Sequence, residues 1–165
     1  MSKKLFFVLI LSVLTMALGA QVTTGNITFS ATYDPSFQIA LPAAYSTTID
    51  DSVAGEKTWS IGTVRVNSNV KNWTLHVSSG SSGYLVNSEN EEEKIQIYFS
   101  LQNQSDGNYL VQDEDLLEPW NSNPQPKTAK AGVNYSFSIS FTPDGEAFME
   151  AGTYNDTITF SIEKP

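Results

Sequence analysis

Cysteine is absent from this chain of 165 residues, and histidine and arginine each occur once, as His76 and Arg65. Without cysteine there is no disulfide, no thiol nucleophile, no lipid-modified cysteine and no Cys/His zinc site. Basic residues are also few, with nine Lys and Arg against 18 Asp and Glu and a net charge of −9. Because phosphate binding needs clustered Lys and Arg, this balance disfavours nucleic acid and anionic lipid surfaces as partners.

Long apolar runs are missing except at the N-terminus. Lys3 and Lys4 precede an uncharged apolar run, Leu5–Leu18, which is followed by small residues. This order predicts a secretory signal peptide over residues 1–20. The 16 residues from 5 to 20 fall short of the roughly 20 needed for a transmembrane helix, and no later segment is apolar enough. We therefore expect no transmembrane segment after cleavage.

The predicted mature chain, residues 21–165, keeps 145 of the 165 residues and loses two lysines, which changes its net charge from −9 to −11. This length fits one domain and buries an adequate core without disulfides. An exported chain without cysteine indicates a bacterial source, so we expect a secreted protein of the periplasm or the bacterial cell surface.

Apolar and polar residues alternate along most of the mature chain, which is typical of strands with one buried face. The strongest alternation predicts strands over Ile27–Tyr33, Trp73–Ser78, Ile95–Gln102, Tyr135–Thr142 and Thr157–Ile162. Weaker strands are expected at Gln38–Leu41, Ile61–Val66 and Tyr109–Val111. Turn residues separate these runs, and no mature stretch has a convincing helical period.

This pattern predicts an all-β fold, an antiparallel immunoglobulin-like sandwich of about seven to nine strands in a single domain. The apolar members of the alternating runs should form its core. The predicted core residues are Ile27, Phe29, Trp73, Leu75, Val77, Ile97, Phe99, Phe137, Ile139, Phe141, Tyr154, Ile158 and Phe160.

Three strand motifs carry a family resemblance. The closing strand, Ala151–Ile162, contains a Gly-x-Tyr-x-Asp pattern, Ile97–Leu101 reads Ile-Tyr-Phe-Ser-Leu, and Asn72–Val77 reads Asn-Trp-Thr-Leu-His-Val. These motifs resemble those of bacterial surface β-sandwich proteins of the spore coat protein U and pilin-like group. The resemblance implies a non-enzymatic, fimbrial-like structural or adhesion-type protein that assembles through its sheet edges. Pilins of the chaperone–usher type place a donor strand ahead of the first domain strand, whereas here only Gln21–Gly25 precede the predicted Ile27 strand.

The closing motif also has a physical interpretation. We expect Gly152 to adopt a positive φ at the turn into the strand. Tyr154 should pack its ring and donate its hydroxyl hydrogen bond to a nearby backbone carbonyl, as in a tyrosine corner. Asp156 should accept backbone N–H bonds from a neighbouring loop. These are structural roles.

Catalytic patterns are weak, and we predict that the protein is not an enzyme. By alternation His76 should face solvent, opposite Trp73, Leu75 and Val77, where no Ser–His–Asp triad is expected. No Gly-x-Ser-x-Gly motif is present. A hydrolase would need two carboxyl groups held across a cleft, whereas runs of adjacent acids are normally solvated.

The stretch Asp113–Gly132 is the longest irregular segment expected, and it carries the candidate ligand residues Asp113, Glu114, Asp115 and Trp120. Loop carboxylates suit Ca²⁺, although the EF-hand spacing is absent and no metal-ligand set can be named. A loop tryptophan stacks on sugars or fixes its loop to a sheet edge, and the second role is favoured here.

Two functions follow. The first is an exported structural or adhesion-type protein with protein partners or self-association through sheet edges. The alternative is a module that binds carbohydrate or Ca²⁺ through the 113–132 loop.

Overall fold

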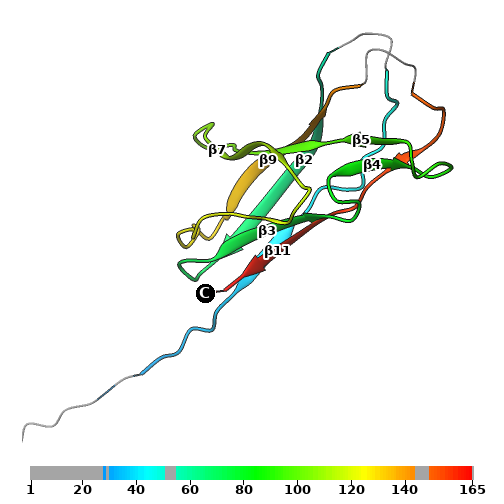
Figure 1. Cartoon of the computed structure of the whole chain (residues 1–165). Coiled ribbons are helices and arrows are strands. Elements are labelled where there is room, and N and C mark those ends of the chain that lie inside the picture. Colours follow the sequence, from blue (N-terminus) through cyan, green and yellow to red (C-terminus); the bar gives the residue numbers. More distant parts are fainter. Residues whose placement is uncertain (1–27, 29, 51–54, 144–148, 165) are drawn as a thin grey trace, which may run out of the picture. The chain divides into compact units, whose positions relative to one another are not determined.

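A computed structural model describes residues 28, 30–50, 55–143 and 149–164 of the chain (Figure 1). The contacts divide the chain after Tyr33, and the compact unit begins at Asp34. Its described residues form strands joined by turns and loops. The strands are β1 (Phe37–Ala40), β2 (Lys57–Ser68), β3 (Thr74–Ser79), β4 (Tyr84–Asn87), β5 (Lys94–Gln96), β6 (Tyr98–Asn103), β7 (Tyr109–Asp115), β8 (Trp120–Asn121), β9 (Val133–Phe141), β10 (Tyr154–Asn155) and β11 (Ile158–Glu163).

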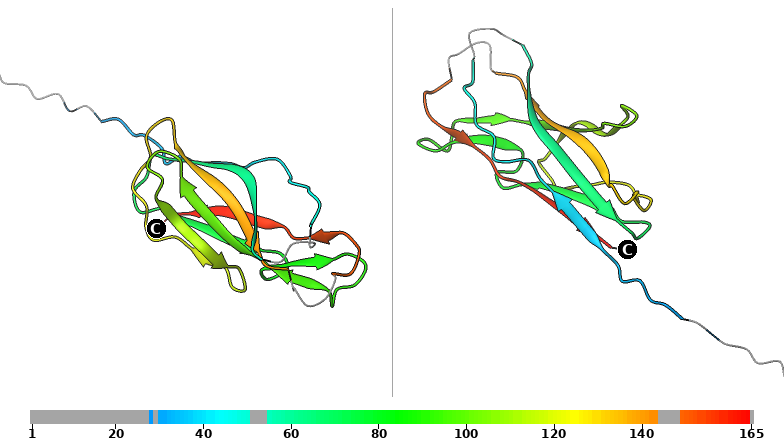
Figure 2. Two further views of the ribbon diagram at one scale, coloured as in Figure 1. Left: turned by 90° about the horizontal axis from the view of Figure 1, so that it is seen from above. Right: turned by 180° about the vertical axis from the view of Figure 1, so that it is seen from behind.

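The fold is the expected all-β antiparallel sandwich, although its eleven described strands exceed the seven to nine predicted. One layer is a five-stranded sheet in the order β1-β2-β9-β6-β7. Its centre is regular because β6 and β9 pair without a shift from Tyr98↔Ser140 to Asn103↔Tyr135. Figure 2 shows this sheet from two further directions.

The second layer consists of two three-stranded sheets, β11-β3-β8 and β10-β4-β5. The two sheets use the same two chain segments, because β3 leads into β4 and β10 leads into β11. A turn of glycine and serine, residues 80–83, interrupts the first segment, and residues 156–157 interrupt the second. The second layer is therefore arranged as one sheet whose strand pairing is interrupted in the middle.

The core lies between the two layers. Eight of the predicted core residues are buried: Trp73, Leu75, Val77, Ile97, Phe99, Phe137, Ile139 and Phe141. The buried set also includes Val64, Val66, Ile95, Val111, Leu116 and Tyr135. Burial and the negative charge of Asp106 raise the pKa of Tyr135 above its usual value of 10.0.

The predicted first strand, Ile27–Tyr33, is wrong for the residues that the structure describes. Thr28 and the segment Ser30–Tyr33 have no strand conformation and are exposed, with Tyr33 at 86 %. Ile27 and Phe29, both predicted core residues, lie outside the described residues. The sandwich thus begins with β1 rather than with this alternating stretch.

Two other predictions of element bounds need correction. The single strand predicted over Ile95–Gln102 is two strands, because the chain crosses between layers at Ile97, whose N–H bonds the carbonyl of Gly83 at 2.9 Å. The stretch Asp113–Gly132 is not one irregular loop. It contains the end of β7 and all of β8, and it is tied to the edge of β3 by the Trp73↔Gln125 bridge.

In the part of the chain that the structure describes, no helix has the length and apolar character needed to cross a membrane.

Candidate functional site

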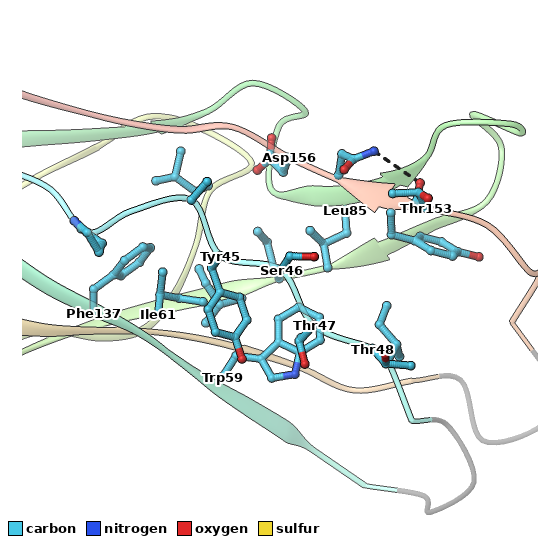
Figure 3. A pocket seen from close by; sticks show the side chains of 18 of the residues that line it. Tyr45, Ser46, Thr47, Thr48, Trp59, Ile61, Leu85, Phe137, Thr153 and Asp156 are labelled. Carbon is cyan, nitrogen blue, oxygen red and sulfur yellow. Dashed lines mark hydrogen bonds between the residues drawn. The ribbon is translucent and has the colours of Figure 1, made fainter.

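A groove of about 730 Å³, lined by both apolar and polar residues, opens between the two layers on the side of β2 and β11 (Figure 3). Trp59 and Ile61 of β2 and Ile139 of β9 line its five-stranded wall. Ile158 and Phe160 of β11 line the opposite wall. Figure 3 shows Tyr45, Ser46 and Thr47 passing over the groove from a segment that belongs to neither sheet.

Two strand edges border this groove. The outer edge of β11 has no partner strand among the described residues, since β11 is the end strand of its sheet. On the opposite wall, β1 covers only Arg65–Ser68 of β2. The half of β2 from Lys57 to Val64 therefore pairs with β9 on one side and with no described strand on the other. Both edges present backbone N–H and C=O groups for further pairing.

Pro42 and Gly62 explain why β1 stops short. Continued pairing would bring Pro42 to the edge of β2, and proline has no N–H to donate. On β2, the register shifts between Ser60 and Gly62, so the strand bulges there. A Cβ added to Gly62 would lie 2.7 Å from the Cβ of Pro42, which shows that the proline ring packs directly on the glycine backbone. The chain consequently leaves the sheet at this point.

The burial of the closing strand reflects the open groove. Tyr154, Ile158 and Phe160 were predicted to be core residues, and they pack against the core but are only half-buried. Phe160 still contacts Phe137 edge-to-face, with ring centroids 5.3 Å apart. The alternation correctly identified the inward face of β11. Ile158 and Phe160 on this face stay half-buried because they line the groove.

The closing motif holds the groove wall in place largely as predicted. The Tyr154 hydroxyl donates to the carbonyl of Glu150 at 2.8 Å, and the Asp156 carboxylate accepts the N–H of Ser81 at 2.9 Å. Gly152 has a positive φ of 159°, as predicted. Its small size is also required by Asn87, whose Oδ1 would lie 2.5 Å from an added Cβ.

Other sheet edges carry features that discourage pairing. On β7, the edge is interrupted at Asp113, which has a φ of 49°, and its pairing with β6 shifts in register. Glu114, which is paired with Phe99, is exposed and places a charge on this edge. β8 and β5 have only two and three residues. In contrast, β11 has six residues in unbroken register with β3 and only Glu163 as a charge.

Trp120, a predicted ligand residue, starts β8 and is half-buried. Its ring meets that of Phe99 edge-to-face, with centroids 5.6 Å apart. Backbone and hydroxyl bonds of Ser122 with Leu75, each 2.9 Å long, tie the following residues to β3. This packing corresponds to a tryptophan that fixes its segment to the sheet edge.

The three acidic candidates lie on β7. Asp113 exchanges bonds with Ser100, because its N–H donates to the serine oxygen at 2.9 Å and its Oδ1 lies 3.2 Å from that oxygen. Asp115 Oδ1 accepts the N–H of Leu117 at 3.2 Å. Glu114 and Asp115 alternate along the strand and so point to opposite faces. No set of three or more His, Cys, Asp or Glu in the described residues is placed to hold a metal.

His76 is half-buried rather than freely exposed. Its Nδ1 lies 2.6 Å from the amide oxygen of Asn121, across the β3–β8 pair. The partner of His76 is therefore an amide rather than the serine and carboxylate that a triad needs.

Sequence reasoning missed the groove itself. Trp59 had no assigned role, and the segment Leu41–Ile49 had no predicted function. Two residues could have indicated where the pairing of the first two strands ends. Pro42 follows the first weak strand, and Gly62 lies within the second.

Comparisons with known proteins give limited similarity. No protein-family model matches the chain, and no curated protein matches it. Among solved structures, one chain belongs to a chaperone–tip adhesin complex of CFA/I fimbriae biogenesis, with 14 % identity and a TM-score of 0.46 over 76 % of this chain. Another belongs to the chaperone–tip adhesion subunit pre-assembly complex of Csu pili from Acinetobacter baumannii, with 16 % identity and a TM-score of 0.41 over 81 % of this chain. This chain spans 41 % of the length of each. We base no functional conclusion on similarity at this level.

Proposed function

We propose that this protein is an exported, non-enzymatic structural subunit of the bacterial periplasm or cell surface that associates with protein partners by accepting a β-strand into the groove between β2 and β11. The observation that carries this proposal is the pair of edges, Lys57–Val64 and β11, that border one groove without a described partner strand. β1 lies beside β11 but does not pair with it. The predicted signal peptide supports the exported location.

Strand addition suits this groove better than a small ligand does. An added strand satisfies edge N–H and C=O groups, while its alternate side chains enter the space between the layers. The half-buried Ile158 and Phe160 would then become fully covered. Natural proteins usually protect a regular edge strand with charge, proline or a bulge, and β11 has these features only at its end, in Glu163.

The donor that we propose is the stretch Ile27–Tyr33 of a second copy. Its sequence alternates Ile27, Phe29, Ala31 and Tyr33 with Thr and Ser, which is the pattern of a strand that buries one face. The described residues of this stretch are exposed and belong to no strand. The stretch is also similar in length to the six residues of β11.

Asn69 supports exchange between copies over insertion within one copy. Its amide nitrogen donates to the carbonyl of Asp34 at 2.8 Å, and its Oδ1 accepts the N–H of Ser36 at 2.8 Å. These bonds hold the chain at the end of β1 that lies away from the unpaired half of β2. A second copy is therefore the acceptor that we propose.

The test is light scattering on the exported protein over a wide concentration range. We expect a concentration-dependent series of oligomers. Replacing Ile27 and Phe29 together by Ser should reduce this series to monomer, because the donor loses its two largest apolar groups. The matched control replaces Thr28 and Thr32 by Ser, on the polar face of the same stretch. Urea denaturation of both variants checks that the sandwich still folds.

A second arm adds a synthetic peptide of residues 26–33 to the Ile27→Ser, Phe29→Ser variant and measures fluorescence anisotropy. Saturable binding of the peptide is expected. A strict monomer at every concentration together with no peptide binding would overturn the proposed function, as would an oligomer series that the donor substitutions leave unchanged.

A carbohydrate or Ca²⁺ module that uses the 113–132 stretch stays a prediction. Asp113, Glu114, Asp115 and Trp120 have structural contacts or positions that need no ligand. No observation on the described residues favours this role over strand addition.

A further inference from the structure

The segment Leu41–Ile49 runs over the mouth of the groove and lines it along its length. None of these residues belongs to a described strand. In Figure 3 the segment crosses between the β2 wall and the β10–β11 wall, with the Tyr45 ring next to Trp59. It therefore occupies part of the space that an added strand would need.

The segment is held at few points. The side chains from Ala43 to Thr48 are all exposed, and only Pro42 and Ile49 are half-buried. Tyr45 is 44 % exposed, and its ring centroid lies 6.1 Å from that of Trp59, at the wide end of the range for aromatic pairs. Trp59 itself is held more closely by Phe141, at 4.5 Å. The segment can therefore leave without removing Trp59 from its place.

The composition of the segment also differs from that of the proposed donor. Between Pro42 and Ile49 it carries Ala43, Ala44, Ser46, Thr47 and Thr48, so Tyr45 is its one large side chain. Ile27–Tyr33 offers Ile, Phe and Tyr with regular alternation and no proline. A regular strand would bury more apolar surface and make more edge hydrogen bonds in the same place.

We infer that Leu41–Ile49 is a displaceable strap that covers the groove in the unassembled subunit and moves out when a donor strand enters. This inference rests on the proposed function and adds the step that controls it. Because the strap is tethered to β1, it competes with any donor at a high effective concentration. It covers apolar surface that would otherwise promote nonspecific association, and its weak hold sets the rate of exchange.

The test uses the full chain carrying Ile27→Ser and Phe29→Ser, so that its own donor does not compete, and the labelled peptide of residues 26–33. Adding Tyr45→Ala should speed peptide association about three- to tenfold, because one aromatic contact of the strap is lost. The matched control is Tyr109→Ala, which removes a tyrosine of similar exposure, 48 %, from β7. The control should leave the association rate unchanged.

Hydrogen exchange distinguishes a strap that is displaced from a segment that stays in place when the peptide binds. Peptide binding should increase exchange in Leu41–Ile49 and decrease it in β11. If the peptide binds but Tyr45→Ala does not alter its rate, or if the strap becomes more protected on binding, the strap inference is wrong while strand addition stands. If no variant binds the peptide, both the proposed function and the strap fail.

Discussion

The hydroxyl of Ser79 donates a hydrogen bond to the carboxylate of Asp156 at 2.7 Å, where both long segments of the second layer are interrupted. The same serine oxygen accepts the N–H groups of Ser81 and Gly83, at 3.1 Å and 2.7 Å. Side-chain oxygens thus replace the strand pairing that is lost at the break. This arrangement keeps β10 and β11 aligned along the groove wall.

Removal of the Asp156 carboxylate should destabilise the protein. In Asp156→Ala, the Ser81 N–H and the Ser79 hydroxyl lose their acceptor in a half-buried site, which should lower the free energy of unfolding by about 1–3 kcal/mol. Urea denaturation measures this change. The exposed Glu91→Gln variant is the control, and a stability equal to that of the unaltered protein would show that water replaces the carboxylate.

Gly152 should not tolerate a methyl group. An added Cβ would lie 2.5 Å from the Asn87 Oδ1 and 2.6 Å from its Nδ2, and Asn87 is fully buried. We expect Gly152→Ala to lower the free energy of unfolding by about 1–3 kcal/mol through overpacking. Gly80→Ala is the matched control, because its nearest described atom would lie at an ordinary 3.5 Å. Equal melting temperatures for the two variants would contradict this prediction.

Tyr135 should make stability fall at alkaline pH. Its folded-state pKa lies above the usual 10.0, so above about pH 10 the unfolded chain releases the proton while the folded chain retains it. The stabilising contribution is complete below the unfolded pKa and is lost as the pH rises through the folded pKa. Tyr135→Phe should flatten this decline in a series of denaturation curves, with Tyr109→Phe as the control. If stability declines equally at alkaline pH in Tyr135→Phe, other titrating groups cause the decline.

Trp120 should contribute to stability. Trp120→Ala removes the edge-to-face contact with Phe99 from a half-buried site and should cost about 2 kcal/mol, below the range for fully buried tryptophan. Denaturation and a glycan-binding screen should be run on the same sample. Loss of glycan binding with unchanged stability would instead support the carbohydrate module.

Calcium should leave the melting temperature unchanged. Asp113 and Asp115 each have a carboxylate oxygen in a hydrogen bond with the protein, and Glu114 points to the face opposite that of Asp115. Thermal unfolding with Ca²⁺ and with a chelator measures the effect. A clear rise with Ca²⁺ that Asp113→Asn abolishes would support the calcium module.

Sequence alone determined the fold class and the inward faces of the strands. Alternation with a period of two follows from strand geometry, so Trp73, Leu75 and Val77 could be placed in the core without any structure. The bond of Tyr154 to Glu150, four residues away, was also predictable from the sequence. The sequence predicted that Asp156 accepts a backbone N–H bond but did not identify the donor, Ser81, which is 75 residues away.

Only the tertiary structure decided which strands lie at edges and what covers them. Ile27–Tyr33 and Ile158–Ile162 alternate equally well, yet the described residues of the first are exposed and the second forms half of a groove. Alternation reports which side of a strand is apolar and carries no information on its neighbours. The groove depends on where Pro42 takes the chain out of the sheet and on the break at Ser79 and Asp156, and these are long-range relationships between segments far apart in the sequence.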